Sequence, residues 1–418
     1  MPTHAVRYYI TLSALILSFF IALGSSFIMF QSFLQVELKL DAPHIAIIYT
    51  AIAFVALFCA PVFGMWQGML GTSKRLLTVI GIGLALATPI LGVLFIAASK
   101  ISFVLAVIIA GLYFGTIIQS GVSSVESYCE QATRRLGFFE YGQVRLWAPL
   151  GASVSTIMSG IWLSINPYIC FWVSSISGIC FLLALMTLDT TPFNKKEDAA
   201  TTSGQKHSPL ADMHALMVNS KFWRLVSYLF IVSGGFMLFD QQYPIFFAEL
   251  FDKPEVGHKM ASSIMSTQML IEVGFTVILP FVINKTGARN GLLLAGVIMG
   301  VRILAISFTS HVPSSCQIYW AGGLKLLQAI EIPLLILSTF KYIALHFEER
   351  FTATVFLVGF QCSQQVSTIF LSTLLGISYK SSLGYTGTYT LMGLIILALT
   401  ALALFTLPRC RDALTKAS

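Results

Sequence analysis

Three polar residues share one face of an otherwise apolar segment, residues 323–335 (GLKLLQAIEIPLL). They are Lys325, Gln328 and Glu331, and each follows the previous one by three positions. A helix advances about 100° per residue, so the three side chains lie within an arc of about 120°. A charge in hydrocarbon costs at least about 2.5–3.5 kcal/mol, and such residues usually face a bundle interior or a water-filled path. The pattern predicts a helix that lines a pathway; the alternative is an ion pair that only holds helices together.

Other charged residues interrupt the apolar runs, and their signs nearly balance. The acids are Glu126, Asp240, Glu272 and Glu331, and the bases are Arg145, Arg302 and Lys325. Buried charges need partners, or they become neutral, so the one acid in excess is expected to hold a proton. We take Glu331 as the group that binds and releases this proton, because no base adjoins it in sequence. The alternative is an ionised acid that faces a water-filled vestibule.

Arginine, carboxylate and glutamine are also the groups that a sugar site needs, because sugar hydroxyls pair with bidentate donors and acceptors. Gln268 and Glu272 are four residues apart and so lie on one helix face. Trp147, two residues after Arg145, is a candidate for stacking beneath a sugar ring, with packing as the alternative role.

These residues must be positioned by membrane-spanning helices. The 418 residues are 56% hydrophobic and only 10% charged, whereas soluble chains are about a quarter charged. Strand-like alternation is absent, so we predict an all-α membrane protein with twelve transmembrane helices. A span needs about 20 apolar residues. On this rule the expected spans are 8–34, 44–67, 75–98, 101–126, 143–165, 167–188, 222–247, 259–284, 290–310, 315–340, 351–376 and 383–407.

One long hydrophilic segment, residues 189–221, has the composition of a flexible cytoplasmic linker. It divides the chain into an N-terminal six-helix half, 1–188, and a C-terminal six-helix half, 222–418. This is the layout of secondary transporters of the major facilitator type. Similar short loops follow the second span of each half, at 64–75 and 284–289, which is weak evidence for an internal repeat. Lys and Arg gather in loops on one side, which places both termini in the cytoplasm.

Several function classes are not supported by the sequence. The net charge of +7 lies mainly in short loops and does not indicate a nucleic-acid partner. The seven cysteines are scattered, with neither metal-ligand spacing nor a disulfide framework, so we expect no metal and no cofactor. The seven histidines are also scattered, without a His-x-x-x-His pair, and we expect no enzyme activity.

Three stretches resemble the lactose permease family, the oligosaccharide/proton symporters of the major facilitator superfamily. The first contains Glu126, Arg134-Arg135 and the run from Phe139 to Arg145. The second is residues 239–242 (FDQQ), and the third runs from Lys325 through Glu331-Ile-Pro333 to Thr354. The similarity spans nearly the whole chain.

The resemblance implies a role for individual residues. Glu126 and Arg145 occupy the positions of the family's sugar-binding acid and arginine. Arg302 and Glu331 match the arginine and glutamate assigned to proton handling. Asp240 and Lys325 match a charge pair between the seventh and tenth spans.

The chain also departs from the family pattern. The family's stacking tryptophan, eighth-span glutamate and tenth-span histidine are replaced by Ala152, Met269 and Gln328, and a loop aspartate after the second span is replaced by Gly68. A second charge pair is lost on both sides, at Met237 and Gln364, which is sensible because losing one partner would strand a buried charge. Gln268, Glu272 and the Gly359-Phe-Gln361 run are similar to the sucrose permease branch, so the sugar is not determined.

The predicted function is a proton-coupled symporter that imports a di- or oligosaccharide, of sucrose or galactoside type, by alternating access. We expect a monomer in the inner membrane, with the sugar midway between the halves. The expected sugar contacts are Glu126, Arg145, Gln268, Glu272 and Gln328, while Glu331 with Arg302 carries the proton. An uncoupled facilitator or a drug/proton antiporter is the alternative, which Gln328 and Gly68 allow. A polytopic membrane enzyme is a remote third candidate.

Overall fold

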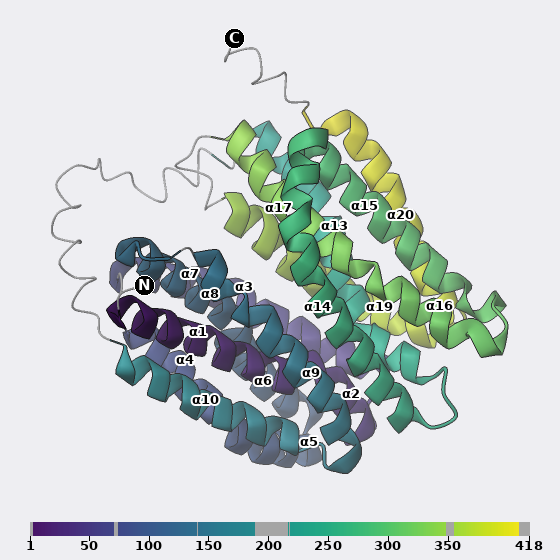
Figure 1. Cartoon of the computed structure of the whole chain (residues 1–418). Helices are drawn as coiled ribbons and strands as arrows, with labels where there is room; N and C mark the ends of the chain where they lie inside the picture. The colour runs from purple at the N-terminus through teal and green to yellow at the C-terminus, as the bar shows by residue number, and fades with distance from the viewer. Residues whose placement is uncertain are drawn as a thin grey trace, which may run out of the picture. The chain divides into compact units, whose positions relative to one another are not determined.

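The computed structural model describes residues 3–70, 74–139, 141–188, 216, 218–347 and 355–408, and their regular elements are all helices (Figure 1). The predicted linker, 189–221, lies outside the described residues over 189–215 and at 217. Within these ranges no strand occurs, as the absence of period-two alternation predicts.

Helices in the N-terminal part of the chain follow the predicted apolar runs, and several contain a short π-helical stretch. They are α1 (Thr3–Leu23), η1 (Gly24–Ile28), α2 (Phe30–Val36), α3 (Ala42–Leu70), α4 (Arg75–Ala85), η2 (Thr88–Phe95), α5 (Ile96–Ile101), α6 (Phe103–Tyr113), η3 (Phe114–Gln119), α7 (Ser120–Leu136), α8 (Tyr141–Arg145), α9 (Trp147–Ile165) and α10 (Ile169–Thr187). Because α3 continues to Leu70, Gly68 lies within a helix and not in the predicted loop.

Helices in the C-terminal part are longer and less interrupted. They are α13 (Ser220–Ala248), α14 (Pro254–Thr286), α15 (Ala288–Ser307), η4 (Phe308–His311), α16 (Ser314–Leu326), α17 (Gln328–His346), η6 (Leu357–Cys362), α19 (Ser363–Lys380) and α20 (Gly384–Thr406).

Most of the predicted membrane spans are long and apolar enough to cross a bilayer. Among the described residues, ten helical segments meet this condition, and α4 with the η2–α5 segment, bent by 45°, makes an eleventh. The remaining predicted span, 351–376, overlaps η6 and α19, where Gln361, Gln364 and Gln365 lower the hydropathy. The all-helical membrane fold is therefore confirmed, and twelve spans are consistent with the structure.

The chain forms two compact units. Unit 1 holds the described part of Met1–Gln205 together with Pro244–Leu270, and unit 2 holds that of Lys206–Tyr243 with Ile271–Ser418. The boundaries fall inside α13 and α14, because the first part of α14 packs on α9. There the Ser153 and Ser266 hydroxyls lie 2.7 Å apart. The division at the linker into two six-helix halves stays a prediction.

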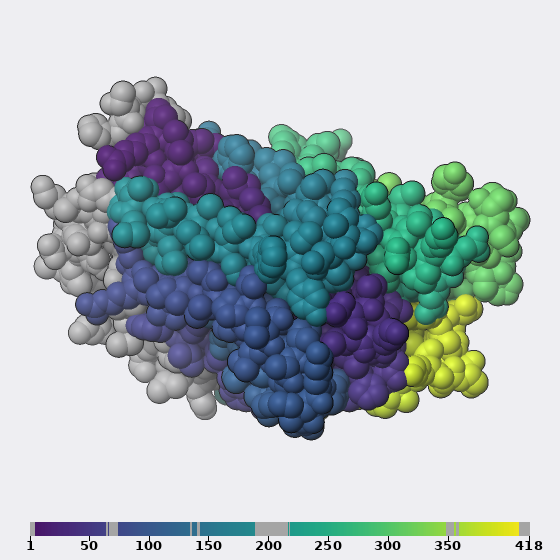
Figure 2. Space-filling model, turned by 90° about the horizontal axis from the view of Figure 1, so that it is seen from below, coloured from purple at the N-terminus to yellow at the C-terminus, as the bar shows by residue number. Residues whose placement is uncertain are grey.

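Unit 1 is built around α1, which packs against both α9 and α10, while α10 packs against α4. Figure 2 shows atoms of α1, in purple, beside those of α10, in teal. The α10–α4 approach is close enough to require glycine. A Cβ added to Gly178 would lie 2.3 Å from the Ala85 amide nitrogen.

In each unit, a cation that follows the second span of its sequence half bonds to backbone carbonyls. These carbonyls lie at the end of the last helix of that half. In unit 1 the Lys74 ammonium donates to the Leu188 carbonyl, and Arg7 donates to Thr187. In unit 2 Arg289 Nε donates to the Leu407 carbonyl at 2.9 Å, and its Nη2 donates to Leu404. A cation at a helix C-terminus complements the dipole and the unpaired carbonyls there.

Gly287 makes the second of these contacts possible. It is the only residue between α14 and α15, and its φ of 88° is a backbone conformation that favours glycine. This turn starts α15 so that Arg289 faces α20, beside which α15 lies in Figure 1.

Replacing Arg289 with Gln should destabilise unit 2 by about 1–2 kcal/mol, because charge-assisted hydrogen bonds to the end of α20 are lost. Thermal unfolding of the purified protein in detergent measures this as a lower midpoint. The matched control is Lys285→Gln, a charge removal at an exposed position four residues away. Equal midpoints for the two variants would contradict the capping role.

Candidate functional site

A fully buried ion pair joins α15 to α17 in unit 2. Arg302 Nε lies 2.9 Å from Glu331 Oε2, and Nη2 lies 2.6 Å from Oε1. Both side chains are 0% exposed. Two parallel hydrogen bonds between a guanidinium and a carboxylate are the strongest geometry available to such a pair.

A second ion pair joins α16 to α13 in the same unit. Lys325 Nζ lies 2.5 Å from Asp240 Oδ1, with Lys325 0% and Asp240 25% exposed. Gln328 bridges the two residues. Its Nε2 donates to both Asp240 oxygens, at 3.0 and 2.8 Å, and its Oε1 accepts from Lys325. The two ion pairs and Gln328 form what we call the charge network.

One helix break and two prolines lie in the helices that carry the charge network. The polar stripe predicted on one helix is divided at Leu327, where α16 ends and α17 begins. Pro333 in α17 and Pro244 in α13 each lack the N–H that would bond the carbonyl four residues earlier. For Pro244 that carbonyl belongs to Asp240, so α13 continues to Ala248 but lacks one backbone hydrogen bond beside a charged side chain.

Aromatic rings cover the cations of the charge network. The Phe239 ring centroid is 4.5 Å from Arg302 Cζ and 5.4 Å from Lys325 Nζ. The Tyr243 ring centroid is 5.0 Å from Lys325 Nζ. Sequence reasoning did not select Phe239, although its place directly before Asp240 was the available signal.

One expectation from sequence is corrected by this geometry, and a second residue has a partner that the sequence did not show. Glu331 is not the acid in excess here, because Arg302, 29 residues away in sequence, pairs with it on both oxygens. Gln328 was expected to contact sugar, which stays a prediction; here its amide nitrogen donates to both oxygens of Asp240. In this conformation it belongs to the charge network.

The predicted sugar-binding pair comes together in unit 1. Arg145 Nε of α8 lies 3.2 Å from Glu126 Oε1 of α7, and the side chains are 48% and 26% exposed. An open ion pair of this kind contributes only about 0–1 kcal/mol to stability. Its carboxylate and guanidinium remain accessible to a polar ligand.

Three other candidates from the sequence are Gln268, Glu272 and Trp147. Gln268 is buried and Glu272 is half-buried, one turn apart on α14. The Trp147 indole donates to the Tyr9 hydroxyl at 3.2 Å, which ties it to α1 and favours its packing role. Among the described residues, no group of three or more acidic, histidine or cysteine side chains could hold a metal ion.

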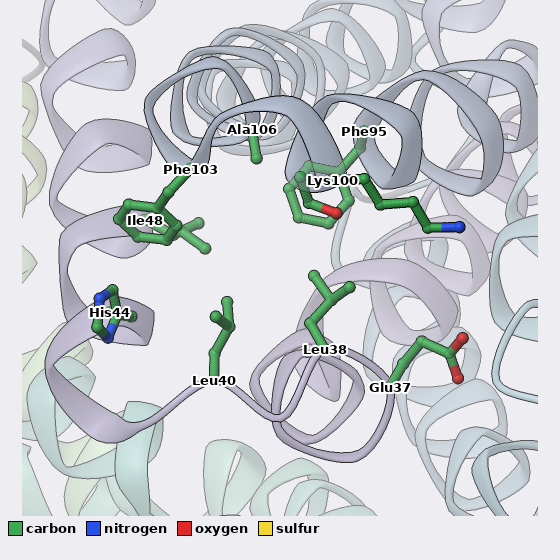
Figure 3. A pocket seen from close by; sticks show the side chains of 10 residues that line it. Glu37, Leu38, Leu40, His44, Ile48, Phe95, Lys100, Phe103 and Ala106 are labelled. Carbon is green, nitrogen blue, oxygen red and sulfur yellow. The ribbon is translucent and has the colours of Figure 1, made fainter.

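Unit 1 also contains a cavity of about 340 Å³ away from these residues (Figure 3). Apolar side chains, including Leu38, Leu40 and Phe103, line its centre, and the charged ends of Glu37 and Lys100 point away from it. His44 and Ser99 also belong to the lining, but its centre offers few of the hydrogen-bonding groups that a sugar needs along its ring.

Known proteins similar to this chain are sugar permeases. The family model described as LacY proton/sugar symporter matches residues 1–418. The lactose permease of Citrobacter freundii is 32% identical over 388 residues, covering 92% of this chain and 91% of that permease. The sucrose permease of Escherichia coli is 30% identical over 400 residues, covering 94% of this chain and 92% of that permease.

A solved structure, that of the nucleoside transporter NupG, resembles this chain with a TM-score of 0.78, covering 96% of this chain and 99% of that one. At 15% identity this likeness shows the fold alone. The family match extends over the whole length of the chain, and the chain therefore belongs to the LacY proton/sugar symporter family.

Proposed function

We propose that this protein is a proton-coupled symporter that imports a di- or oligosaccharide. The observation that carries the proposal is the buried Arg302–Glu331 pair, a carboxylate held out of water by one partner. Intramembrane ionisable residues of this kind mark proton and substrate pathways. Membership of the symporter family supports the same assignment.

The coupling step follows from the geometry of that pair. A carboxyl that has taken up a proton no longer offers Arg302 an anionic partner, so proton binding and the bidentate pair exclude each other. Proton uptake therefore changes the interactions between α15 and α17. If sugar binds the protonated form more tightly, the proton must bind the sugar-loaded form more tightly by the same factor.

Glu126 and Arg145 are our proposed principal sugar contacts, with Gln268 and Glu272 as further candidates. The planar guanidinium of Arg145 can donate to two neighbouring sugar hydroxyls, and the Glu126 carboxylate can accept from such hydroxyls. The relatives are named for different sugars at nearly equal identity, so identity does not select the substrate.

Arg145→Lys should weaken sugar binding at least tenfold, because an ammonium cannot reproduce the planar fork. Stability should change by no more than about 1 kcal/mol, since the pair is open to solvent. Equilibrium binding and thermal unfolding of the same purified sample separate the two effects. Arg224→Lys, at an exposed position in α13, is the control; unchanged sugar affinity in Arg145→Lys would contradict the role.

The remaining parts of the proposal concern the protein's setting. The chain spans the membrane several times, and we place it in the bacterial inner membrane with both termini in the cytoplasm. We also propose that it acts as a monomer, since one chain carries both the sugar pair and the charge network. The similar proteins are permeases, which supports a transporter and not an enzyme.

The deciding experiment follows external pH in a lightly buffered, energy-depleted suspension of expressing cells. Sucrose, lactose, melibiose, raffinose and maltose are added in turn. Alkalinisation with one sugar, absent in cells without the protein, is the expected result and identifies the substrate. Acidification would indicate antiport, and no response without entry of labelled sugar would reject all five as substrates.

An uncoupled facilitator is the second candidate, and Gln328 is the observation that favours it. Where the family has a histidine, this chain has an amide that takes no proton at physiological pH. Entry of labelled sugar down its gradient without any pH change would establish the facilitator.

A further inference from the structure

We propose that Phe239 is a positioning residue for proton coupling: its ring holds the Arg302 guanidinium when Glu331 takes up a proton. The inference rests on the proposed function of Glu331 and adds an uncharged residue to it. Phe239 lies on α13, is fully buried, and directly precedes Asp240 of the charge network.

The Phe239 ring lies against two buried cations at once. The distances of 4.5 Å to Arg302 Cζ and 5.4 Å to Lys325 Nζ are both within the range of about 6 Å for cation–π attraction. Arg302 and Lys325 are themselves buried, so water competes little for them. Attraction of this kind is strongest when the cation is desolvated.

Apart from Glu331, the Arg302 guanidinium has few hydrogen-bond acceptors in the described part of the chain. Its Nε and Nη2 bond to Glu331, while its Nη1 is buried without a hydrogen-bond partner in the described part of the chain. When Glu331 becomes neutral, the guanidinium loses its counter-charge in a site closed to water. A buried cation without compensation is strongly unfavourable, so an attractive surface already in contact with it matters.

The other polar groups near the pair are engaged elsewhere. Asp240 and Gln328 bond to each other and to Lys325, and the Tyr243 hydroxyl donates to the Ala321 carbonyl at 3.3 Å. From α20, the Tyr389 ring packs on Phe239 with centroids 5.2 Å apart. Of these groups, Phe239 is the one whose ring lies against Arg302. Within the described part of the chain, the charged and titratable groups of this cluster are thus Arg302 on α15, Lys325 on α16, and Asp240 and Tyr243 on α13, with Tyr389 of α20 packed on Phe239.

The ring favours the protonated state of the site. The face of an aromatic ring is partially negative, so it attracts a cation and repels an anion. While Glu331 is ionised, its negative charge offsets part of the attraction between the ring and Arg302. Once Glu331 is neutral, the ring meets an uncompensated cation. Removing the ring should therefore make proton uptake require a lower pH.

The test titrates Glu331 directly in the purified protein, without any sugar. The infrared band of the protonated Glu331 carboxyl is identified by its loss in Glu331→Gln and followed against pH. In Phe239→Leu the midpoint of this titration should move to lower pH by about one unit. Phe222→Leu, a buried ring on the same helix that contacts Trp223, is the control and should leave the midpoint unchanged.

A second variant keeps the shape of the ring and removes its negative face. Phe239 replaced by 3,4,5-trifluorophenylalanine should shift the midpoint in the same direction, and Phe239→Trp should stay near wild type. If Phe239→Leu does not fold, the trifluoro variant decides alone. A wild-type midpoint in the folded variants would overturn the inference. A titrating Glu331 in a protein whose sugar transport ignores protons would instead reject the proposed function.

Discussion

Glu331→Gln is expected to keep the exchange of sugar across the membrane and to abolish its accumulation. Glutamine has nearly the shape of the protonated acid, so the variant remains in the proton-loaded form and cannot release a proton. Exchange needs only that loaded form to alternate, whereas accumulation needs the proton gradient. Labelled-sugar exchange in vesicles and uptake in energised cells measure the two activities.

The control for Glu331→Gln is Glu255→Gln, which removes an exposed carboxylate in the first turn of α14. It should match wild type in both assays. Accumulation at the wild-type level in Glu331→Gln would remove Glu331 from the coupling role. Loss of exchange together with accumulation would show that the Arg302 pair is needed for the structure itself.

Replacing Asp240 and replacing Lys325 should destabilise the protein by different amounts, although each change breaks the same ion pair. Asp240→Asn leaves the Lys325 cation at a fully buried position, where an unpaired charge costs about 3–5 kcal/mol. Lys325→Met leaves Asp240, which is 25% exposed and still accepts from Gln328, so the loss should be smaller. Unfolding midpoints in detergent provide the comparison.

The double variant Asp240→Asn with Lys325→Met is the decisive member of this set. Because it leaves no stranded charge, it should be more stable than Asp240→Asn alone. Additive losses would mean that the two residues do not depend on each other. The expected rescue would agree with the simultaneous loss of charge at Met237 and Gln364, the pair that this chain has replaced on both sides.

Hydropathy predicted the membrane helices well, because the bilayer requires long apolar segments whatever their packing. The expected span 143–165 coincides with the structure, and most others differ by a few residues. The span 351–376 was predicted on the same rule, although η6 and α19 carry glutamines that lower its hydropathy.

Only the family resemblance linked Glu331 to Arg302, because composition and spacing do not show which helices pack together. Arg302 and Glu331 are 29 residues apart on separate helices, and only the packing of α15 against α17 brings them together. The count of acids and bases therefore pointed correctly to buried charge, but it did not show that Glu331 pairs with a base. The partner of Gln328 was hidden for a related reason: its spacing places it on the polar stripe but does not show that Asp240 of another helix lies beside it.

The cations that bond to the ends of α10 and α20 indicate how this chain originated. Lys74 and Arg289 follow the same helix in their respective sequence halves, and each bonds to the end of the last helix of its own unit. The same device in equivalent places is what the duplication of a six-helix ancestral gene would leave behind. On that account the unequal distribution of charges, with the charge network in one half and the Glu126–Arg145 pair in the other, would be a later specialisation.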